Sequence, residues 1–147
     1  MAALLMGGIL AGLSLDKVIV QLPARRRLGA VGYARYARAA DLGNGVVFYA
    51  IVGVGAAALT VAAFGIALAV NASATVRLLL GAAAVLSVLH SAVTGRAAPT
   101  MFRIGQAPDT PEALEPLLSR FARWSAVRAV LQVSTFVVVA AAIITGD

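Results

Sequence analysis

The chain has 147 residues, of which 61% are hydrophobic and 12% are charged, and its net charge is +6. A soluble protein of this length cannot bury so much apolar surface, whereas a lipid bilayer can accommodate it. The absence of cysteine excludes disulfide bonds, thiolate metal sites and cysteine nucleophiles. The single histidine excludes a metal centre built from several histidines of one chain.

Four apolar segments are long enough to cross a bilayer, because a helix needs about 20 residues to span about 30 Å of hydrocarbon. They cover residues 2–22, 46–70, 76–95 and 121–145. These segments are too long and too rich in alanine for the strands of a membrane barrel. The first segment lacks the basic residues that open a signal peptide, so we expect it to be retained. The sequence therefore predicts one all-α domain over residues 1–147, an integral membrane four-helix bundle.

The basic residues predict how this bundle is oriented. The loops after the first and third segments carry nine arginines: Arg25, Arg26, Arg27, Arg35, Arg38, Arg96, Arg103, Arg120 and Arg123. Arg77 is the only basic residue expected on the opposite side of the membrane. Cytoplasmic loops are enriched in lysine and arginine. We therefore expect both long loops to be cytoplasmic and both termini to lie outside, in a plasma membrane of bacterial type.

The connectors differ in their predicted structure. Residues 71–75 (NASAT) predict a tight turn between antiparallel helices. The first helix is expected to end at Pro23, and the following loop predicts an interfacial helix that ends at Gly43 and Gly45. Tyr33 of that helix is expected in the headgroup layer. In the third loop, Thr110 predicts the N-cap of a separate short helix.

Each predicted span brings one polar side chain to a similar depth. Asp16, His90 and Arg128 are expected roughly 7 to 10 Å from the cytoplasmic end of their spans, and Tyr49 about one turn into its own. Polar residues inside a membrane are costly and usually face protein or water. The four side chains therefore predict a polar pocket in the cytoplasmic half of the bundle.

The spacing of small residues predicts which of these side chains point inward. Gly8, Gly12 and Asp16 follow one another at intervals of four, which is typical of a close-packed helix interface. We therefore expect Asp16 to face the bundle interior and Lys17 to extend toward the headgroups. The candidate catalytic residues are His90, Asp16 and Arg128, and the candidate substrate-binding residues are Tyr49, Asn44, Trp124, Gln132 and Thr94.

This set of residues suits proton transfer. A histidine such as His90 can remove a proton from a phenol or an acidic carbon, with Asp16 orienting the ring. Arg128 can stabilise the resulting oxyanion more strongly than it would in water. A structural explanation is equally open, since Asp16 and Arg128 could form an ion pair that holds two helices together. Trp124 is typical of an aromatic side chain at the membrane interface.

Three segments resemble the anthrone oxygenase-like family of small four-helix membrane proteins. They are AGLSLDKVIVQLP (11–23), YARYARAADLGNGVVFY (33–49) and RFARWSAVRAVLQ (120–132). The resemblance implies a four-span bundle and, from a few relatives, the cofactor-independent oxygenation of anthrones to anthraquinones. The positions that match the family pattern are Trp124, Arg128, Asp41, Asn44 and Tyr49.

Three classes of function follow from these observations. The first is a membrane enzyme or binding protein for an aromatic, polyketide-like, quinone-like or lipid-like molecule. The second is a structural or accessory subunit that packs against itself or another membrane protein. The third is a small transporter. The expected partners are anionic lipid headgroups at the arginines and a hydrophobic small molecule, with no nucleic acid. The sequence contains no nucleotide-binding or metalloprotease motif, so we name no metal ligand and leave the identity of any cofactor open.

Overall fold

A computed structural model describes residues 1–146 and contains helices but no strands within that range. The elements are α1 (Ala2–Leu15), the π-helical segment η1 (Asp16–Gln21), α2 (Leu22–Ala40), α3 (Asn44–Ala69), α4 (Ala74–Gln106) and α5 (Pro111–Ile144). The first three follow one another without a break, so the described chain forms four long helical segments. All four are long and apolar enough to cross a membrane, and the predicted all-α four-helix bundle is confirmed.

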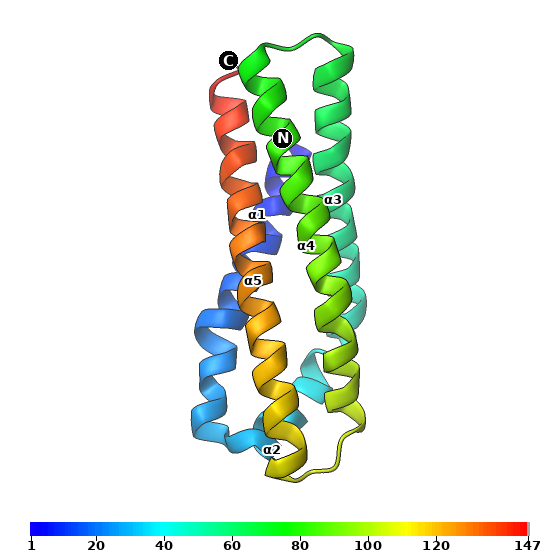
Figure 1. The fold of residues 1–147 in the computed structure, drawn as a ribbon, viewed down its shortest axis with the longest axis vertical. Coiled ribbons are helices and arrows are strands. Elements are labelled where there is room, and N and C mark those ends of the chain that lie inside the picture. The colour runs from blue at the N-terminus through cyan, green and yellow to red at the C-terminus, as the bar shows by residue number, and fades with distance from the viewer. Residues whose placement is uncertain (147) are drawn as a thin grey trace.

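The four segments run side by side along the long axis of the molecule (Figure 1), and each packs against two others. Helix α1 packs against α3 and α5, α3 packs against α4, and α4 packs against α5. The turn at residues 70–73 and the last turns of α5 lie at one end, which we call the hairpin end. Helix α2, the end of α4 and the start of α5 lie at the other, which we call the arginine-rich end.

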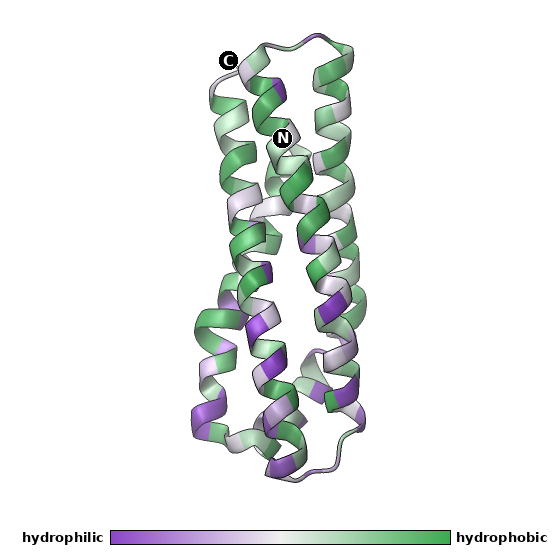
Figure 2. Ribbon diagram, viewed as in Figure 1, coloured by the Kyte–Doolittle hydropathy of each residue, from purple (hydrophilic) through white to green (hydrophobic). Residues whose placement is uncertain are grey.

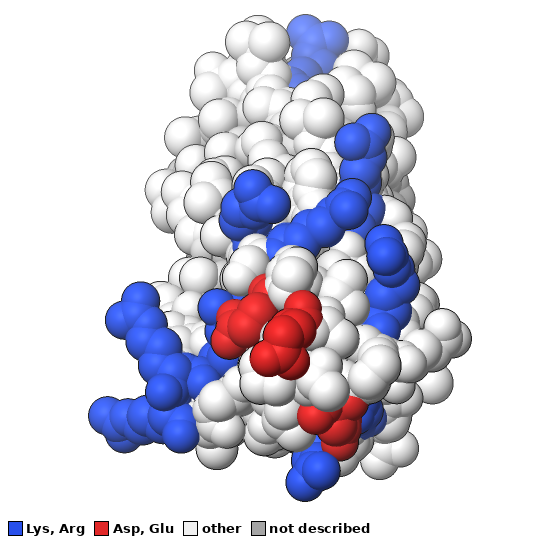
Figure 3. Space-filling model, turned by 60° about the horizontal axis from the view of Figure 1, so that its bottom comes forward, with Lys and Arg blue, Asp and Glu red and all other residues white. Residues whose placement is uncertain are grey.

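Apolar and charged residues separate along the long axis. Apolar residues dominate the helices on the hairpin side, whereas hydrophilic residues concentrate toward the arginine-rich end (Figure 2). Figure 3 looks toward that end, where basic side chains are spread over the surface around a few acidic ones. The arginine-rich loops that the sequence predicts on one side of the membrane thus lie together at one end of the folded molecule.

The first helix continues past Pro23, contrary to the prediction that it ends there. Proline lacks the N–H that would donate to the carbonyl four residues earlier, and it normally breaks or kinks a helix. Here the π-helical segment precedes it, and the Leu22 N–H donates to Lys17 O, five residues back. The wider turn adds one residue, so Leu22, five residues after the inward-facing Lys17, also faces the interior. The chain thus crosses the proline without leaving the helix.

A sharp kink divides α2 at Gly29. Its φ of 71° and ψ of 168° lie in a region that is essentially restricted to glycine. The kink folds residues 30–40 beneath the bundle, where Tyr33 is 1% exposed in an apolar cluster with Leu118 and Phe121. Tyr33 therefore belongs to the protein core, and its predicted place in the headgroup layer is wrong. The helix ends at Ala40, and Gly45 already lies within α3.

Helices α4 and α5 are longer than the predicted spans. The segment predicted as a loop over residues 96–120 is helical except for residues 107–110. Thr110 is the N-cap residue of α5 itself, and its side chain makes no capping hydrogen bond. The predicted separate short helix is thus the first part of α5. At the hairpin end, by contrast, the predicted tight turn is confirmed, with Asn71 at a φ of 50°.

One side chain ties α2 to the ends of the two long helices. The Arg38 guanidinium donates to the carbonyl oxygens of Ile104 (3.0 Å from Nη2) and Ala107 (2.7 Å), which end α4. It also forms an ion pair with Asp109, to which Arg35 Nε donates at 3.0 Å. Charge-assisted bonds of this kind satisfy carbonyl groups that the end of a helix leaves free. We call this set of contacts the Arg38 clamp.

Candidate functional site

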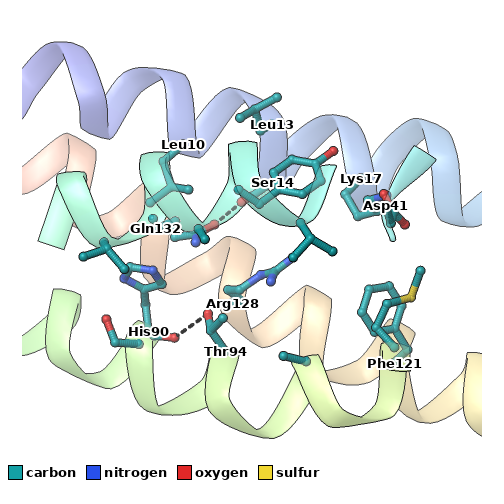
Figure 4. A pocket seen from close by; sticks show the side chains of 18 of the residues that line it. Leu10, Leu13, Ser14, Lys17, Asp41, His90, Thr94, Phe121, Arg128 and Gln132 are labelled. Carbon is teal, nitrogen blue, oxygen red and sulfur yellow. Dashed lines mark hydrogen bonds and ion pairs between the residues drawn. The ribbon is translucent and has the colours of Figure 1, made fainter. Parts of the chain in front are cut away.

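A cavity of about 390 Å³ lies inside the bundle, in the half near the arginine-rich end (Figure 4). Its walls come from α1, η1, α3, α4, α5 and the turn before α3. The lining is mostly apolar, and its polar members are Ser14, Lys17, Asp41, Tyr49, His90, Ser91, Thr94, Arg128 and Gln132. This size and this mixture of walls are typical of sites for small organic molecules.

Arg128 of α5 presents its guanidinium to this cavity without an anionic partner. Among residues 1–146, no carboxylate lies within ion-pair distance of it, and its Nε is buried without a hydrogen-bond partner. A buried charge is costly unless it is paired and hydrogen-bonded. The predicted ion pair between Asp16 and Arg128 is therefore absent from the described residues.

Lys17 is the second cation at the cavity, and it is fully paired. It is 4% exposed, and its Nζ donates to Asp41 Oδ1 and to Gln21 Oε1, both at 2.6 Å. Asp41 is 7% exposed and its other oxygen, Oδ2, has no partner. The Lys17 ammonium also lies 5.9 Å from the centre of the Tyr49 ring. The expectation that Lys17 extends toward the headgroups is wrong.

Asp16 lies outside the cavity, contrary to the prediction that it points inward. Its side chain is exposed and accepts a hydrogen bond from Gln21 Nε2. The physical reason is geometric, since each interval of four residues rotates a helix face by about 40°. Gly8 packs against the Phe136 ring, but Gly12 and Asp16 have rotated away from the interface. Asp16 is thus linked to Lys17 only through Gln21.

His90 lies at the junction of two cavities. It is 4% exposed and lines both the main cavity and a smaller one of about 10 Å³. The smaller cavity is also lined by Thr60, Ser87, Gln132 and Thr135. Figure 4 shows His90 and Arg128 on either side of the space below Gln132, which accepts a hydrogen bond from Ser14 Oγ. The structure therefore brings the predicted histidine and arginine to one site.

The predicted substrate-binding residues divide into two groups. Tyr49, Thr94 and Gln132 line the cavity as expected, although the Thr94 hydroxyl donates to the His90 carbonyl of its own helix at 2.9 Å. Asn44 is exposed at the start of α3 and does not line the cavity. Trp124 is half-buried on α5 and also lies outside the lining. Neither residue is therefore placed to contact a ligand inside this cavity.

The site also contains residues that were not among the predicted catalytic or substrate-binding set. Lys17 and Ser14 belong to the buried face of the first helix, which runs through Ala3, Leu10, Ser14 and Lys17. Intervals of seven, four and three are typical of the buried face of a helix. This spacing could have predicted that Ser14 and Lys17 face inward, but the prediction for this helix used the spacing of Gly8, Gly12 and Asp16 instead. Asp41 could be noticed only through the family resemblance.

No group of three or more histidine, aspartate or glutamate side chains within residues 1–146 is placed to hold a metal ion. No family model matches the chain, and no curated protein or solved structure matches it either.

Proposed function

We propose that this protein binds, within the membrane, a hydrophobic molecule that carries one anionic oxygen, and that the cavity around Arg128 holds it. The observation that carries this proposal is the Arg128 guanidinium at the cavity, whose Nε is buried without a hydrogen-bond partner and which forms no ion pair with a carboxylate of residues 1–146. An oxyanion placed against Arg128 would supply the missing charge and the missing hydrogen-bond acceptor.

The charges around the cavity support a ligand with a single negative charge. Lys17 and Asp41 neutralise each other at 2.6 Å, so Arg128 leaves one positive charge in excess. A neutral molecule would leave that charge unpaired in surroundings of low polarity, where charge interactions are strong. A doubly charged ligand would instead bring an uncompensated negative charge of its own.

The apolar walls support an aromatic, quinone-like or polyketide-like body for the ligand. Leu10 and Leu13 line one side of the cavity, and Met101, Phe102 and Phe121 line the region toward the arginine-rich end. Aromatic and methionine side chains give favourable contacts with flat ring systems. A phenolate or an enolate of a fused-ring molecule combines such a body with the required oxyanion.

A naphthol-type probe tests the binding site directly. We expect the purified protein to bind naphtholate, and Arg128→Gln to weaken binding about 10- to 100-fold, since a hydrogen bond to a charged group contributes about 1.5–3 kcal/mol. The matched control is Arg120→Gln, which removes an exposed arginine from the same helix. Equal affinities for Arg128→Gln and the unchanged protein would reject Arg128 as the anion-binding group.

A cavity-filling substitution supplies a second test that leaves every charge in place. Gly53 lines the cavity, and a Cβ added there meets no atom within 4 Å. Gly53→Leu is therefore expected to fold normally and to abolish probe binding. Gly65 on the same helix has equally open space but does not line the cavity, so Gly65→Leu is the control. Loss of binding in both variants would point to a general effect on α3.

The oxygenation of such a ligand is a second candidate function, favoured by the buried His90 beside Arg128. His90 would remove a proton from an acidic CH₂ group, and Arg128 would stabilise the resulting enolate. Molecular oxygen would serve as the oxidant, converting the CH₂ to a carbonyl and releasing water. Asp16 is too exposed to orient His90 in this scheme.

Anthrone and oxygen consumption test this second function. We expect His90→Gln to retain naphtholate binding but to lose oxygen uptake with anthrone. If the unchanged protein binds the probe and consumes no oxygen, the binding function stands alone. A purely structural role predicts instead that Arg128→Gln and His90→Gln lower the thermal stability of a protein that never bound the probe.

A further inference from the structure

The cavity is bounded by lining residues of very different exposure. Its exposed members are Val46, Ala50, Val54, Ser91 and Phe102. All of them belong to α3 or α4, whereas none of the lining residues of α1, η1 or α5 is exposed. The exposed residues of α3 follow at intervals of four and therefore form one edge along that helix. The cavity thus reaches the surface between α3 and α4.

The arginine-rich end of the cavity is closed by packed side chains. The Lys17–Asp41 ion pair lies there together with Met101 and Phe121. Beneath them, Tyr33 and Leu118 belong to a continuous apolar cluster that joins α2, α4 and α5. The Arg38 clamp fixes α2 across this end. A path from the aqueous phase at this end would have to separate these contacts.

The opposite end of the cavity is closed as well. Leu10 packs against Val52 and Ala56 in a separate apolar cluster, and Ser14 is bonded to Gln132 across the bundle. Near the hairpin end, α3 and α4 approach closely, because a Cβ added at Gly81 would lie 3.2 Å from the Phe64 ring. The two helices are therefore in contact there, and the exposed lining residues place the opening at the level of the cavity.

We infer that ligands reach the cavity sideways from the bilayer, through the opening between α3 and α4 edged by Val46, Ala50, Val54 and Phe102. The α3 edge of the opening lies on an apolar span, with Val54 69% exposed. In a bilayer the side chains of this edge face acyl chains, so a molecule dissolved in the hydrocarbon layer meets no aqueous barrier on this route. The nature of the ligand rests on the proposed function, but the route does not.

The route selects a chemical class of ligand. A molecule that crosses the apolar edge must be mainly hydrocarbon or aromatic, and the acidic hydroxyl near one end of it must be uncharged during the crossing. That polar end then meets Arg128 on the inner side of the cavity, while the apolar part remains near the opening. Small water-soluble anions cannot use the route, because transfer of a charge into hydrocarbon is too costly.

Cysteine labelling tests the route without any ligand, because the chain has no cysteine of its own. Gly53→Cys places a thiol in the cavity, in space that a Cβ can occupy freely. In vesicles, we expect the membrane-dissolved reagent pyrenyl maleimide to label this thiol at least tenfold faster than sulfonatoethyl methanethiosulfonate supplied on both sides. Asn71→Cys in the exposed turn checks that the sulfonate reagent is active.

A bulky substitution at the opening provides the matched comparison. Ala50→Trp at the edge should slow pyrenyl maleimide labelling of Gly53→Cys at least fivefold. Ala58→Trp, at an exposed position of α3 away from the cavity, should leave the rate unchanged. Both tryptophan variants are first compared with the parent for thermal stability, so that only folded proteins are scored.

Three results would overturn the inference. They are faster labelling by the sulfonate reagent, no labelling by either reagent, and equal slowing by the two tryptophans. These outcomes are separate from a failure of the proposed function, which is measured by naphtholate binding. If the thiol is labelled from the bilayer but naphtholate does not bind, the opening exists and the ligand is of another chemical class. If naphtholate binds but the thiol is labelled from water, the binding site exists and ligands reach it by another route.

Discussion

Lys17 and Asp41 are 24 residues apart in the chain and form a buried ion pair at 2.6 Å. Lys17 lies in the π-helical segment before α2, and Asp41 lies in the turn after it. The pair therefore joins the two ends of α2 and holds residues 30–40 beneath the bundle. Because it also lies at the cavity wall, the same contact shapes the fold and the site.

Removal of one partner of this pair should destabilise the protein strongly. Asp41→Asn leaves the Lys17 ammonium buried without a carboxylate, which typically costs about 3–5 kcal/mol. Lys17→Met combined with Asp41→Leu removes both charges and should recover most of that loss. Thermal unfolding in detergent measures the three proteins. A double variant less stable than Asp41→Asn would show that the charges themselves stabilise the fold.

The kink at Gly29 should be intolerant of a side chain. At a φ of 71° and a ψ of 168°, any other residue is strained, and we expect Gly29→Ala to cost about 1–3 kcal/mol. Gly32→Ala is the control, because the added Cβ would make an ordinary 3.4 Å contact with Leu28. Denaturant unfolding of both variants measures the difference. Equal stabilities would mean that α2 can adopt another path.

The Arg38 clamp should weaken in acid. Hydrogen bonds from Arg38 and Arg35 lower the pKa of Asp109 below its usual range. Because the folded pKa is the lower one, the stabilisation is present above the unfolded value and is lost as pH falls through the folded value. Since the usual aspartate pKa is about 3.9, the loss falls below that pH.

A comparison with Asp109→Asn isolates this effect. The variant lacks the titrating carboxylate, so the melting temperatures of the two proteins should differ at neutral pH and converge below about pH 4. Because Asp109 is exposed, the difference should also shrink as salt is added. A difference that persists unchanged at the lowest pH would assign it to something other than the charge of Asp109.

The arginine-rich end is predicted to face the cytoplasm, with both termini outside. Single cysteines report this orientation cleanly in a chain without native cysteine. In intact cells, a membrane-impermeant thiol reagent should label Asn71→Cys and should label Arg27→Cys only after the membrane is opened. The reverse pattern would invert the topology. Neither outcome alters the cavity or its opening to the bilayer.

The membrane-spanning character of the chain was predictable because it depends on composition over long windows. The chain has four apolar segments separated by charged or turn-forming residues. Inside a bilayer the backbone N–H and C=O groups of each segment must find hydrogen-bond partners without water, and a helix provides them within the segment. The sequence also predicted that Asp16, His90, Arg128 and Tyr49 lie at a similar depth, which follows from residue number, and three of the four line one cavity. Thr94 and Gln132, which share a helix face with His90 and Arg128, line it as well.

The rotation of each helix was decided by the tertiary structure. Asp16 and Lys17 are neighbours in sequence, yet one is exposed and the other buried, because a helix turns by about 100° per residue. The π-helical turn before Pro23 and the kink at Gly29 then set where α2 runs. That path brings Asp41 to Lys17. Because Asp41 pairs with Lys17, Arg128 remains as the cation at the cavity without an ion-pair partner. The sequence thus determined which residues lie at the depth of the site, and the packing of the helices decided which of them face it.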